Sequence, residues 1–167
     1  MKSGGAIANH ITDLKDYAAD YGLSNYTVDM AKNNIASKVK EGALISNTTL
    51  DAEKVSIRAM AKQFYPTLSG LIDQGVKVSN VADIYTQQMQ KVLELPYTSI
   101  NWADDPYISK ALQNKGMDGV SQGKEGALNL SDFNVMLRND ARWSKTQNAR
   151  EEAAGYANSI LRSFGLA

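Results

Sequence analysis

The chain has 167 residues, of which 43% are apolar and 22% are charged, a balance that is typical of a globular protein with one domain or two small ones. Lys and Arg together number 18, as do Asp and Glu, so the chain lacks the basic excess that is usual in free-standing nucleic-acid-binding proteins. There is no cysteine and His10 is the single histidine, which excludes disulfides, thiolate metal sites, cysteine nucleophiles and any site built from several histidines.

The N-terminal part of the chain predicts a flexible leader and two helices. Residues 1–5 include two glycines and lack the apolar core of a secretory signal, which indicates a leader or a linker. Over residues 6–21, apolar side chains recur at intervals of three and four, which predicts an amphipathic helix that stops at Gly22. Thr27 predicts the N-cap of a second helix, and Gly42 predicts its end.

The next segment predicts a third helix that a proline interrupts. Thr48 and Asp51 have the spacing of a weak capping box, and the apolar pattern behind them extends to Tyr65. Because Pro66 lacks a backbone donor, we expect a kink or a break there, after which a helix continues over 67–74.

Capping signals mark two further helices in the middle of the chain. Ser79 or Asn80 predicts the N-cap of a helix that Pro96 closes. Asp105 followed by Pro106 strongly indicates the start of a helix. The carboxylate can accept hydrogen bonds from the free N–H groups of the first turn, and proline at the first helical position costs no hydrogen bond, because the N–H there has no partner within the helix. A short helix is expected to follow.

The C-terminal third predicts a glycine-rich segment and two more helices. Its glycines indicate a loop or a small hairpin near 114–128. Ser131 predicts the N-cap of the next helix, which ends at Asn139. Thr146 begins the last helix, whose apolar side chains follow one side as far as Phe164.

Together these patterns predict an all-α fold of about seven or eight short helices in a bundle-like arrangement. The expected organisation is a leader over 1–5, an N-terminal helical part over 6–95 and a C-terminal helical part over 96–167, or alternatively one single domain. No apolar run approaches the roughly 18 residues of a membrane-spanning helix, so no stable membrane span is expected.

Two polar features resemble catalytic groups but have simpler interpretations. His10 could act with Asp13, yet a histidine beside an apolar stripe is more often a boundary or surface residue. Asp104 and Asp105 could form a carboxylate pair, but capping of the following helix explains them without a ligand. We therefore predict no catalytic residue.

The glycine-rich segment lacks the pattern of a metal or phosphate site. An EF-hand loop beginning at Asp118 would need oxygen ligands at its third and fifth positions and Glu at its twelfth, where the chain has Val120, Gln122 and Asn129. The Gly-Lys-Ser/Thr ending of a phosphate-binding loop is also missing. We predict no metal and no cofactor.

Positive charge gathers in the last third of the chain, where acidic residues partly offset it. Mixed charges on helix surfaces usually pair in solvent, so any contact with DNA is expected to be weak. Trp102 and Trp143 are expected to anchor a core or an interface rather than to stack on bases. The basic residues of this region are Arg138, Arg142, Lys145, Arg150 and Arg162.

Several segments carry a family resemblance. They are Leu-Ser-Asp-Phe at 130–133, Leu-Arg-Asn-Asp-Ala-Arg-Trp at 137–143, Thr-x-x-Ala-Arg at 146–150 and Leu-Arg-Ser-Phe-Gly at 161–165, with 61–66, Tyr85, 105–108 and 111–112 upstream. Over about residues 55–165 the chain resembles a C-terminal segment of virion proteins of tailed bacteriophages, particularly those of actinobacteria. Such segments occur in tail tape-measure proteins and in internal proteins that are ejected during infection. The chain has Asp-Ala-Arg-Trp at 140–143 where the family more usually has Asp-Pro-Arg-Trp.

The resemblance implies a structural role in a virion, as a tape-measure-like or ejected internal protein that docks in the tail or tail tip and takes part in genome ejection. It also implies synthesis in the host cytoplasm, other tail proteins as partners, and a homo-oligomer with threefold symmetry. Tape-measure proteins are far longer than this chain, which would then be a domain, a processed fragment or a small relative. The expected interaction anchors are Trp143, Phe133, Tyr107, Phe164 and Trp102, and the expected helix caps are Asp105, Ser131 and Thr146.

Two other classes remain open. A virion-associated muralytic enzyme would need a catalytic Glu in a cleft, for which the candidates are Glu53, Glu94, Glu125, Glu151 and Glu152. A helical protein- or DNA-binding regulatory module would use the helices at 6–21 and 27–42 as a helix-turn-helix, with Lys32, Lys38 and Lys40 on the second helix.

Overall fold

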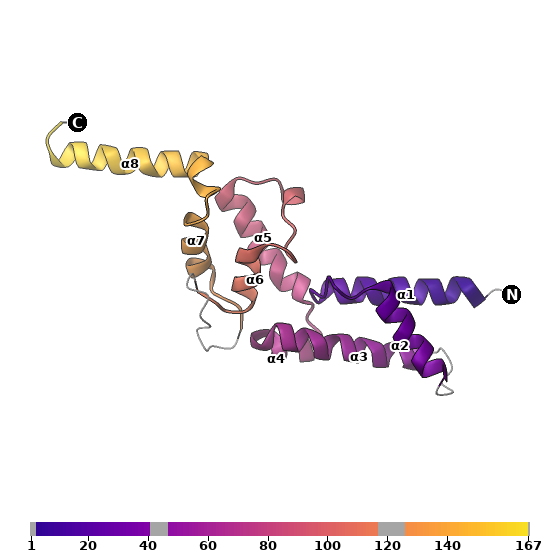
Figure 1. Ribbon diagram of the computed structural model, residues 1–167. Coiled ribbons are helices and arrows are strands. Elements are labelled where there is room, and N and C mark those ends of the chain that lie inside the picture. The colour runs from indigo at the N-terminus through magenta and orange to yellow at the C-terminus, as the bar shows by residue number, and fades with distance from the viewer. Residues whose placement is uncertain (1–2, 41–46, 117–125, 167) are drawn as a thin grey trace.

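A computed structural model describes residues 3–40, 47–116 and 126–166 of the chain. Within these ranges the fold consists of eight α-helices and three short 3-10 helices, without a β-strand, which confirms the all-α prediction (Figure 1). The elements are α1 (Ser3–Asp20), α2 (Val28–Lys40), α3 (Asn47–Phe64), η1 (Pro66–Leu68), α4 (Ser69–Asp73), α5 (Val78–Leu93), η2 (Tyr97–Ser99), α6 (Pro106–Leu112), α7 (Leu130–Arg138), η3 (Trp143–Lys145) and α8 (Gln147–Ser163). The expected loop or hairpin near 114–128 falls largely on residues 117–125, outside the described ranges.

The first three helices pack against one another and carry the N-terminal part of the core. Helix α1 contacts both α2 and α3, and it reaches α5 as well. The apolar stripe expected over 6–21 is buried where α1 meets these neighbours, since Leu14 and Ala18 are fully covered. From the other helices, Ala31 and Ile57 are equally buried.

Helix α5 forms the centre of the second half, where it packs against α6 and α7. Tyr85 of α5 meets Phe133 of α7 edge to face, with ring centroids 4.9 Å apart. The Tyr85 hydroxyl donates a hydrogen bond to the carbonyl of Leu128, and burial raises the pKa of Tyr85 to about 12. These contacts fix α7 against α5 and thereby set the direction in which the chain continues.

One core cluster extends across the expected boundary between 6–95 and 96–167. Its buried side chains run from Ile11 on α1 to Leu137 on α7. Polar contacts also cross this boundary: the Thr67 hydroxyl donates to the carbonyl of Leu112 at 2.8 Å, and the Gly126 N–H donates to the carbonyl of Thr67 at 2.9 Å.

Several predicted helix boundaries are confirmed. Gly22 ends α1 with φ +74°, and a Cβ at this position would lie 2.6 Å from the hydroxyl oxygen of Tyr65, so both conformation and space require glycine. The Thr27 hydroxyl accepts a hydrogen bond from the Met30 N–H and caps α2. Pro66 ends α3 and opens the 3-10 turn η1. The expected end of α2 at Gly42 lies outside the described residues.

Three helices begin earlier than predicted. Helix α1 starts at Ser3, within the expected leader, because glycine lowers helix stability without forbidding the helical conformation. Helix α3 starts at Asn47, before the expected capping box at Thr48. Helix α5 starts at Val78 rather than after Ser79 or Asn80, and no side chain caps it, because the side chain of Val78 is completely buried and holds the first turn in the core.

Candidate interaction surface

Helix α8 projects from the other helices, and no described part of the chain buries its apolar side. Figure 1 shows it leaving the body near the C-terminal end of α5, at the opposite end of the molecule from the N-terminus. None of its residues is buried. We call its apolar side the α8 stripe, which consists of Ala149, Ala153, Tyr156, Ile160, Leu161 and Phe164.

The α8 stripe is most exposed towards the free end of the helix. Tyr156 is 64% exposed, Ile160 is 57% exposed and Phe164 is 73% exposed. Scattered exposed apolar residues are ordinary, but a continuous row of large apolar side chains along one helix side usually marks a surface that another molecule covers. This row is therefore the candidate functional surface of the chain.

The base of α8 is held by two capping groups from different parts of the chain. The Thr146 hydroxyl accepts a hydrogen bond from the Ala149 N–H at 3.0 Å. The carboxylate of Glu94 accepts from the N–H groups of Gln147 and Asn148, each at 2.8 Å. These bonds satisfy N–H groups that lack a partner within the helix, and the negative charge lies at the positive end of the helix dipole.

Glu94 reaches α8 because of the way in which α5 ends. Its backbone adopts the left-handed conformation with φ +53°, and Pro96 follows two residues later. The side-chain amide of Asn148 donates to the carbonyls of Lys91 and Val92 on the last turn of α5. The C-terminus of α5 and the N-terminus of α8 thus form one joint.

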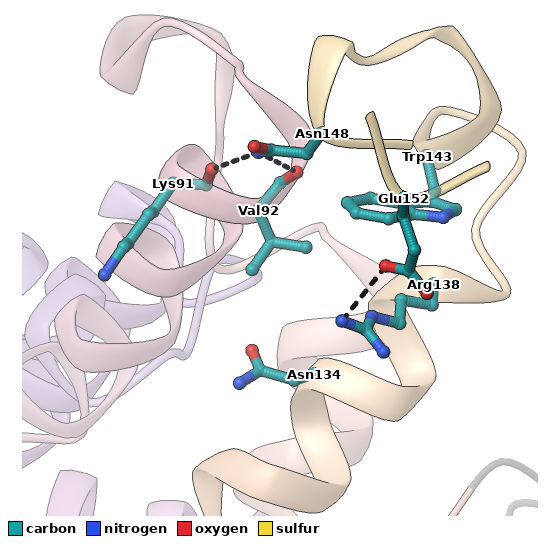
Figure 2. A pocket seen from close by; sticks show the side chains of 7 residues that line it. All are labelled: Lys91, Val92, Asn134, Arg138, Trp143, Asn148 and Glu152. Carbon is teal, nitrogen blue, oxygen red and sulfur yellow. Dashed lines mark hydrogen bonds and ion pairs between the residues drawn. The ribbon is translucent and has the colours of Figure 1, made fainter. Parts of the chain in front are cut away.

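A pocket of about 280 Å³ lies at this joint (Figure 2). Arg138 of α7 pairs with Glu152 of α8 at 3.2 Å, and its guanidinium lies over the ring of Trp143 at 5.7 Å. The ion pair attaches the second turn of α8 to α7, and the cation–π contact attaches η3, which leads into α8, to the same arginine. The lining residues are Lys91, Val92, Asn134, Arg138, Trp143, Asn148 and Glu152.

A second polar network lies under the segment that leads into α8. Arg142 Nε donates to both carboxylate oxygens of Asp140, at 3.0 and 2.9 Å, and Arg142 also reaches Asp105 at 3.4 Å. Burial of Asp140 opposes its ionisation, but the hydrogen bonds and the charge of Arg142 outweigh burial and lower the pKa of Asp140 below its ordinary value. The same hydrogen bonds to Asp140 raise the pKa of Arg142. The network ties the end of α7 to the start of α6.

The five predicted anchors occupy three kinds of position. Phe133 is completely buried and belongs to the core. Trp102, Tyr107 and Trp143 are half-buried and pack against the core from its edge. Phe164 alone among the five extends into solvent, at the end of the α8 stripe.

Two of the three predicted caps are in place, and one is corrected. Asp105 accepts hydrogen bonds from the N–H groups of Tyr107 and Ile108 and caps α6, and Thr146 caps α8 as described above. Ser131 does not cap α7: it lies inside the first turn, and the cap is Asn129, whose side-chain oxygen accepts from the Asp132 N–H at 2.9 Å. The Asn129 side-chain amide also donates a hydrogen bond to the Asp132 carboxylate, so each of the two residues binds the other, as in a capping box. With Asn129 as the cap, the helix starts at Leu130, one residue before Ser131.

The glutamates considered as catalytic candidates make structural contacts. Glu53 is buried and accepts a hydrogen bond from Asn34 at 3.1 Å, while Glu94 and Glu152 hold α8. Glu151 accepts from Gln147 on the same helix, and Glu125 lies outside the described residues. In the described part of the chain, no three His, Cys, Asp or Glu side chains are grouped as metal ligands would be.

The basic residues of the last third are partly engaged by carboxylates. Arg138 pairs with Glu152, and Arg142 pairs with Asp140 and Asp105. On the second helix of the expected helix-turn-helix, Lys32 pairs with Asp29 at 3.7 Å. The side chains of Lys38 and Lys40 are not among those that the structure describes.

Sequence reasoning missed the function of Glu94 at the joint. Its partners are 53 and 54 residues away in the sequence, so no local pattern marks it as a cap. Asn129 could have been found, because Asn129 and Asp132 have capping-box spacing immediately before the apolar residues of α7.

None of the helices in the described ranges combines the length and the apolar character that crossing a membrane requires. No family model, curated protein or solved structure matches the chain.

Proposed function

We propose that this chain is a structural protein of a bacteriophage virion, a tape-measure-like or ejected internal protein that docks in the tail or tail tip. Its partners are other virion proteins and further copies of itself, and it carries no catalytic activity. The observation that carries the proposal is the α8 stripe, a row of large apolar side chains on a helix without a buried residue.

The energetics of the α8 stripe favour a partner. Burial of a large apolar side chain contributes about 1.5–3 kcal/mol. Tyr156, Ile160 and Phe164 obtain little of this contribution within the chain itself, because each is more than half exposed. A neighbouring subunit that covers them supplies the missing burial.

The way in which α8 is mounted supports a docking role. Glu94 and Thr146 cap its first turn, and Arg138 holds its second turn through Glu152. The base of the helix is therefore fixed while its apolar end is presented to solvent. A fixed helix loses less conformational freedom on binding than a flexible tail does.

The virion assignment rests on the resemblance of residues 55–165 to tailed-phage virion proteins. The projecting helix supplies most of the resembling segments at 146–150 and 161–165. The capping, core and ion-pair contacts of Asp105, Phe133 and Arg142 account physically for other motifs of that resemblance. Those contacts require no substrate or metal.

The test is the protein composition of purified phage particles from a lysate in which the chain is expressed. Mass spectrometry is expected to find the chain in the particles at a constant ratio to the major tail protein. If the chain is abundant in the lysate but absent from particles, the proposal is wrong.

Two further assays address the competing classes. A peptidoglycan-clearing assay with the purified chain is expected to give no activity, and a gel shift is expected to give no DNA complex that survives physiological salt. Clearing activity that depends on one of the candidate glutamates would replace the structural proposal with the enzyme class.

A further inference from the structure

The side chains of the α8 stripe change in size along the helix. Ala149 and Ala153 lie near the base, Tyr156 lies in the middle, and Ile160 and Phe164 lie towards the free end. The α8 stripe therefore offers a shallow half and a prominent half. Between Ala149 and Phe164 the helix rises about 22 Å, so these halves are well separated.

We propose that the α8 stripe is covered by α8 of a second copy, in an antiparallel pair. With the twofold axis between Tyr156 and Ala157, Ala149 faces Phe164 of the other copy and Ala153 faces Ile160. Ile160 and Phe164, the prominent side chains towards the C-terminal end of the helix, then each meet an alanine of the other copy, which lets the two helix axes stay close along the contact. This inference rests on the proposed function and deepens it, because it names one of the neighbours that hold the chain.

A parallel pair fits the same surface poorly. It would place Ala149 against Ala149 and Phe164 against Phe164, so the helices would be close at one end and apart at the other. Helix pairs pack at interaxial distances of about 8–10 Å, depending on the side chains at the contact, and a change of size along the contact prevents continuous packing.

The position of the body also favours the antiparallel arrangement. In the part of the chain that the structure describes, α8 joins the packed helices at its N-terminal end (Figure 1). In an antiparallel pair the two bodies lie at opposite ends of the contact, whereas a parallel pair would bring both to the same end. The antiparallel pair therefore leaves the full length of the α8 stripe accessible.

The charges of α8 suit a second copy better than a lipid surface. Arg150 and Arg162 balance Glu151 and Glu152, so two copies of the helix have no net repulsion. Amphipathic helices that lie on anionic membranes are typically rich in Lys and Arg on the polar side, and this helix has no such excess.

The area available predicts a reversible dimer. The large side chains of the α8 stripe expose about 500 Å² per copy, so the pair buries at most about 1,000 Å² in total, the lower limit of specific interfaces. Interfaces of this size are typical of weak and transient contacts, so the pair is expected to form and dissociate reversibly. The symmetry is twofold, in contrast to the threefold symmetry that the phage resemblance implies.

Sedimentation analysis of the full chain tests the pairing. The mass is expected to rise from one copy to two as the concentration increases from about 1 to 100 µM. The double variant Ile160→Glu with Phe164→Glu is expected to remain a monomer over this range. Its matched control, Asn158→Glu with Ser159→Glu on the polar side of the same helix, is expected to dimerise as the original chain does.

Single cysteines test the direction of the pair, since the chain contains no other thiol. Ala157→Cys lies beside the twofold axis and is expected to form a disulfide-linked dimer under mild oxidation. Ala149→Cys places the two thiols about 22 Å apart along the pair, beyond the roughly 7 Å between Cα atoms that a disulfide spans, and is expected to remain unlinked.

A monomer at every concentration overturns the inference, as does a trimer or a linked Ala149→Cys dimer. The failure of this inference is distinguishable from the failure of the proposed function. A monomeric chain that is found in phage particles removes only the pairing, and a dimeric chain that is absent from particles removes only the virion assignment.

Discussion

At the scale of single residues, Glu94 decides the direction of α8. It ends α5 in the left-handed conformation and caps α8 with both oxygens of its carboxylate. The two hydrogen bonds are charge-assisted and lie at the N-terminal end of α8, where the helix dipole adds to them. Together with the Thr146 cap and the Arg138–Glu152 ion pair, this side chain holds the α8 stripe in a defined direction.

Replacement of Glu94 by Gln is expected to loosen the base of α8. The amide keeps one acceptor but loses the charge and the second acceptor, and caps of this kind contribute about 0.5–2 kcal/mol. Hydrogen exchange is expected to accelerate at the amides of Gln147 and Asn148 and along the following turns, while the amides of α5 keep their rates. Glu151→Gln is the control, because exposed Glu151 accepts a hydrogen bond from Gln147 of the same helix rather than from another element. Equal exchange in Glu94→Gln and the original chain would contradict the capping role.

Asp140 makes the stability of the region depend on pH. Its folded-state pKa lies below the ordinary value of an aspartate side chain, which is about 3.9. The contribution of the Asp140 carboxylate to the free energy of unfolding is therefore fully present above that ordinary value, and it is lost as the pH falls through the lower folded-state pKa.

Asp140→Asn is expected to reduce the free energy of unfolding by about 1–3 kcal/mol at neutral pH, because the hydrogen bonds that the partly exposed Arg142 donates to buried Asp140 lose their charged acceptor. Urea titrations followed by tryptophan fluorescence measure this difference. Below about pH 4 the difference is expected to shrink, because the original carboxylate becomes protonated as well. Asp16→Asn, on an exposed part of α1, is the control. A difference that stays constant down to the lowest pH would show that the ionised carboxylate is not its cause.

At the scale of elements, α8 differs from the other long helices in what covers it. The stripe of α1 is buried against α2, α3 and α5, whereas the α8 stripe has no cover in the described part of the chain. Because the apolar side of α8 adds little to the core, the helix and the body are expected to be energetically separable.

Truncation of the chain after Glu152 is expected to leave the stability of the body almost unchanged. The removed residues are exposed, and the cost is expected to stay below about 0.5 kcal/mol when unfolding is measured at a concentration that keeps the chain monomeric. Leu137→Ala provides the contrast, because this side chain is completely buried and its loss costs about 2–5 kcal/mol. A truncation that destabilises the body as much as Leu137→Ala does would show that α8 belongs to the core.

The elements themselves could be predicted from the sequence to a large extent. Local signals suffice for the Asp105–Pro106 start, the Gly22 stop and the Pro66 break, since each acts within one turn of its own position. The start of α5 could not be predicted in this way, because the burial of Val78 by distant residues extends the helix past its polar cap candidates.

The exposure of the α8 stripe could not be predicted from the sequence either, because it too depends on which distant residues pack against the helix. The periodic pattern of α8 has the same form as that of α1, because periodicity reports that a helix has an apolar side and not what lies against it. Phe133 and Phe164 were equal anchor candidates, yet one lies in the core and the other extends into solvent. Only the packing of the whole chain separates them.

At the scale of the whole molecule, the fold combines a packed body with one projecting helix, α8, whose first turns are held against the body. The body contains the core cluster from Ile11 to Leu137, and α8 begins where this cluster ends. This division lets the chain keep its fold while its apolar helix is held by neighbours. The account depends on the claim that the α8 stripe is covered when the chain is in its working assembly.

Oxidative labelling by hydroxyl radicals tests that claim most directly, because it reports the exposure of individual aromatic side chains. In the free chain at low concentration, Tyr156 and Phe164 are expected to be labelled as readily as the exposed Phe64, and Phe133 is expected to be protected. In purified phage particles that contain the chain, labelling of Tyr156 and Phe164 is expected to fall to the level of Phe133. If both remain as reactive in the particle as in the free chain, the α8 stripe is not what holds this protein in its assembly.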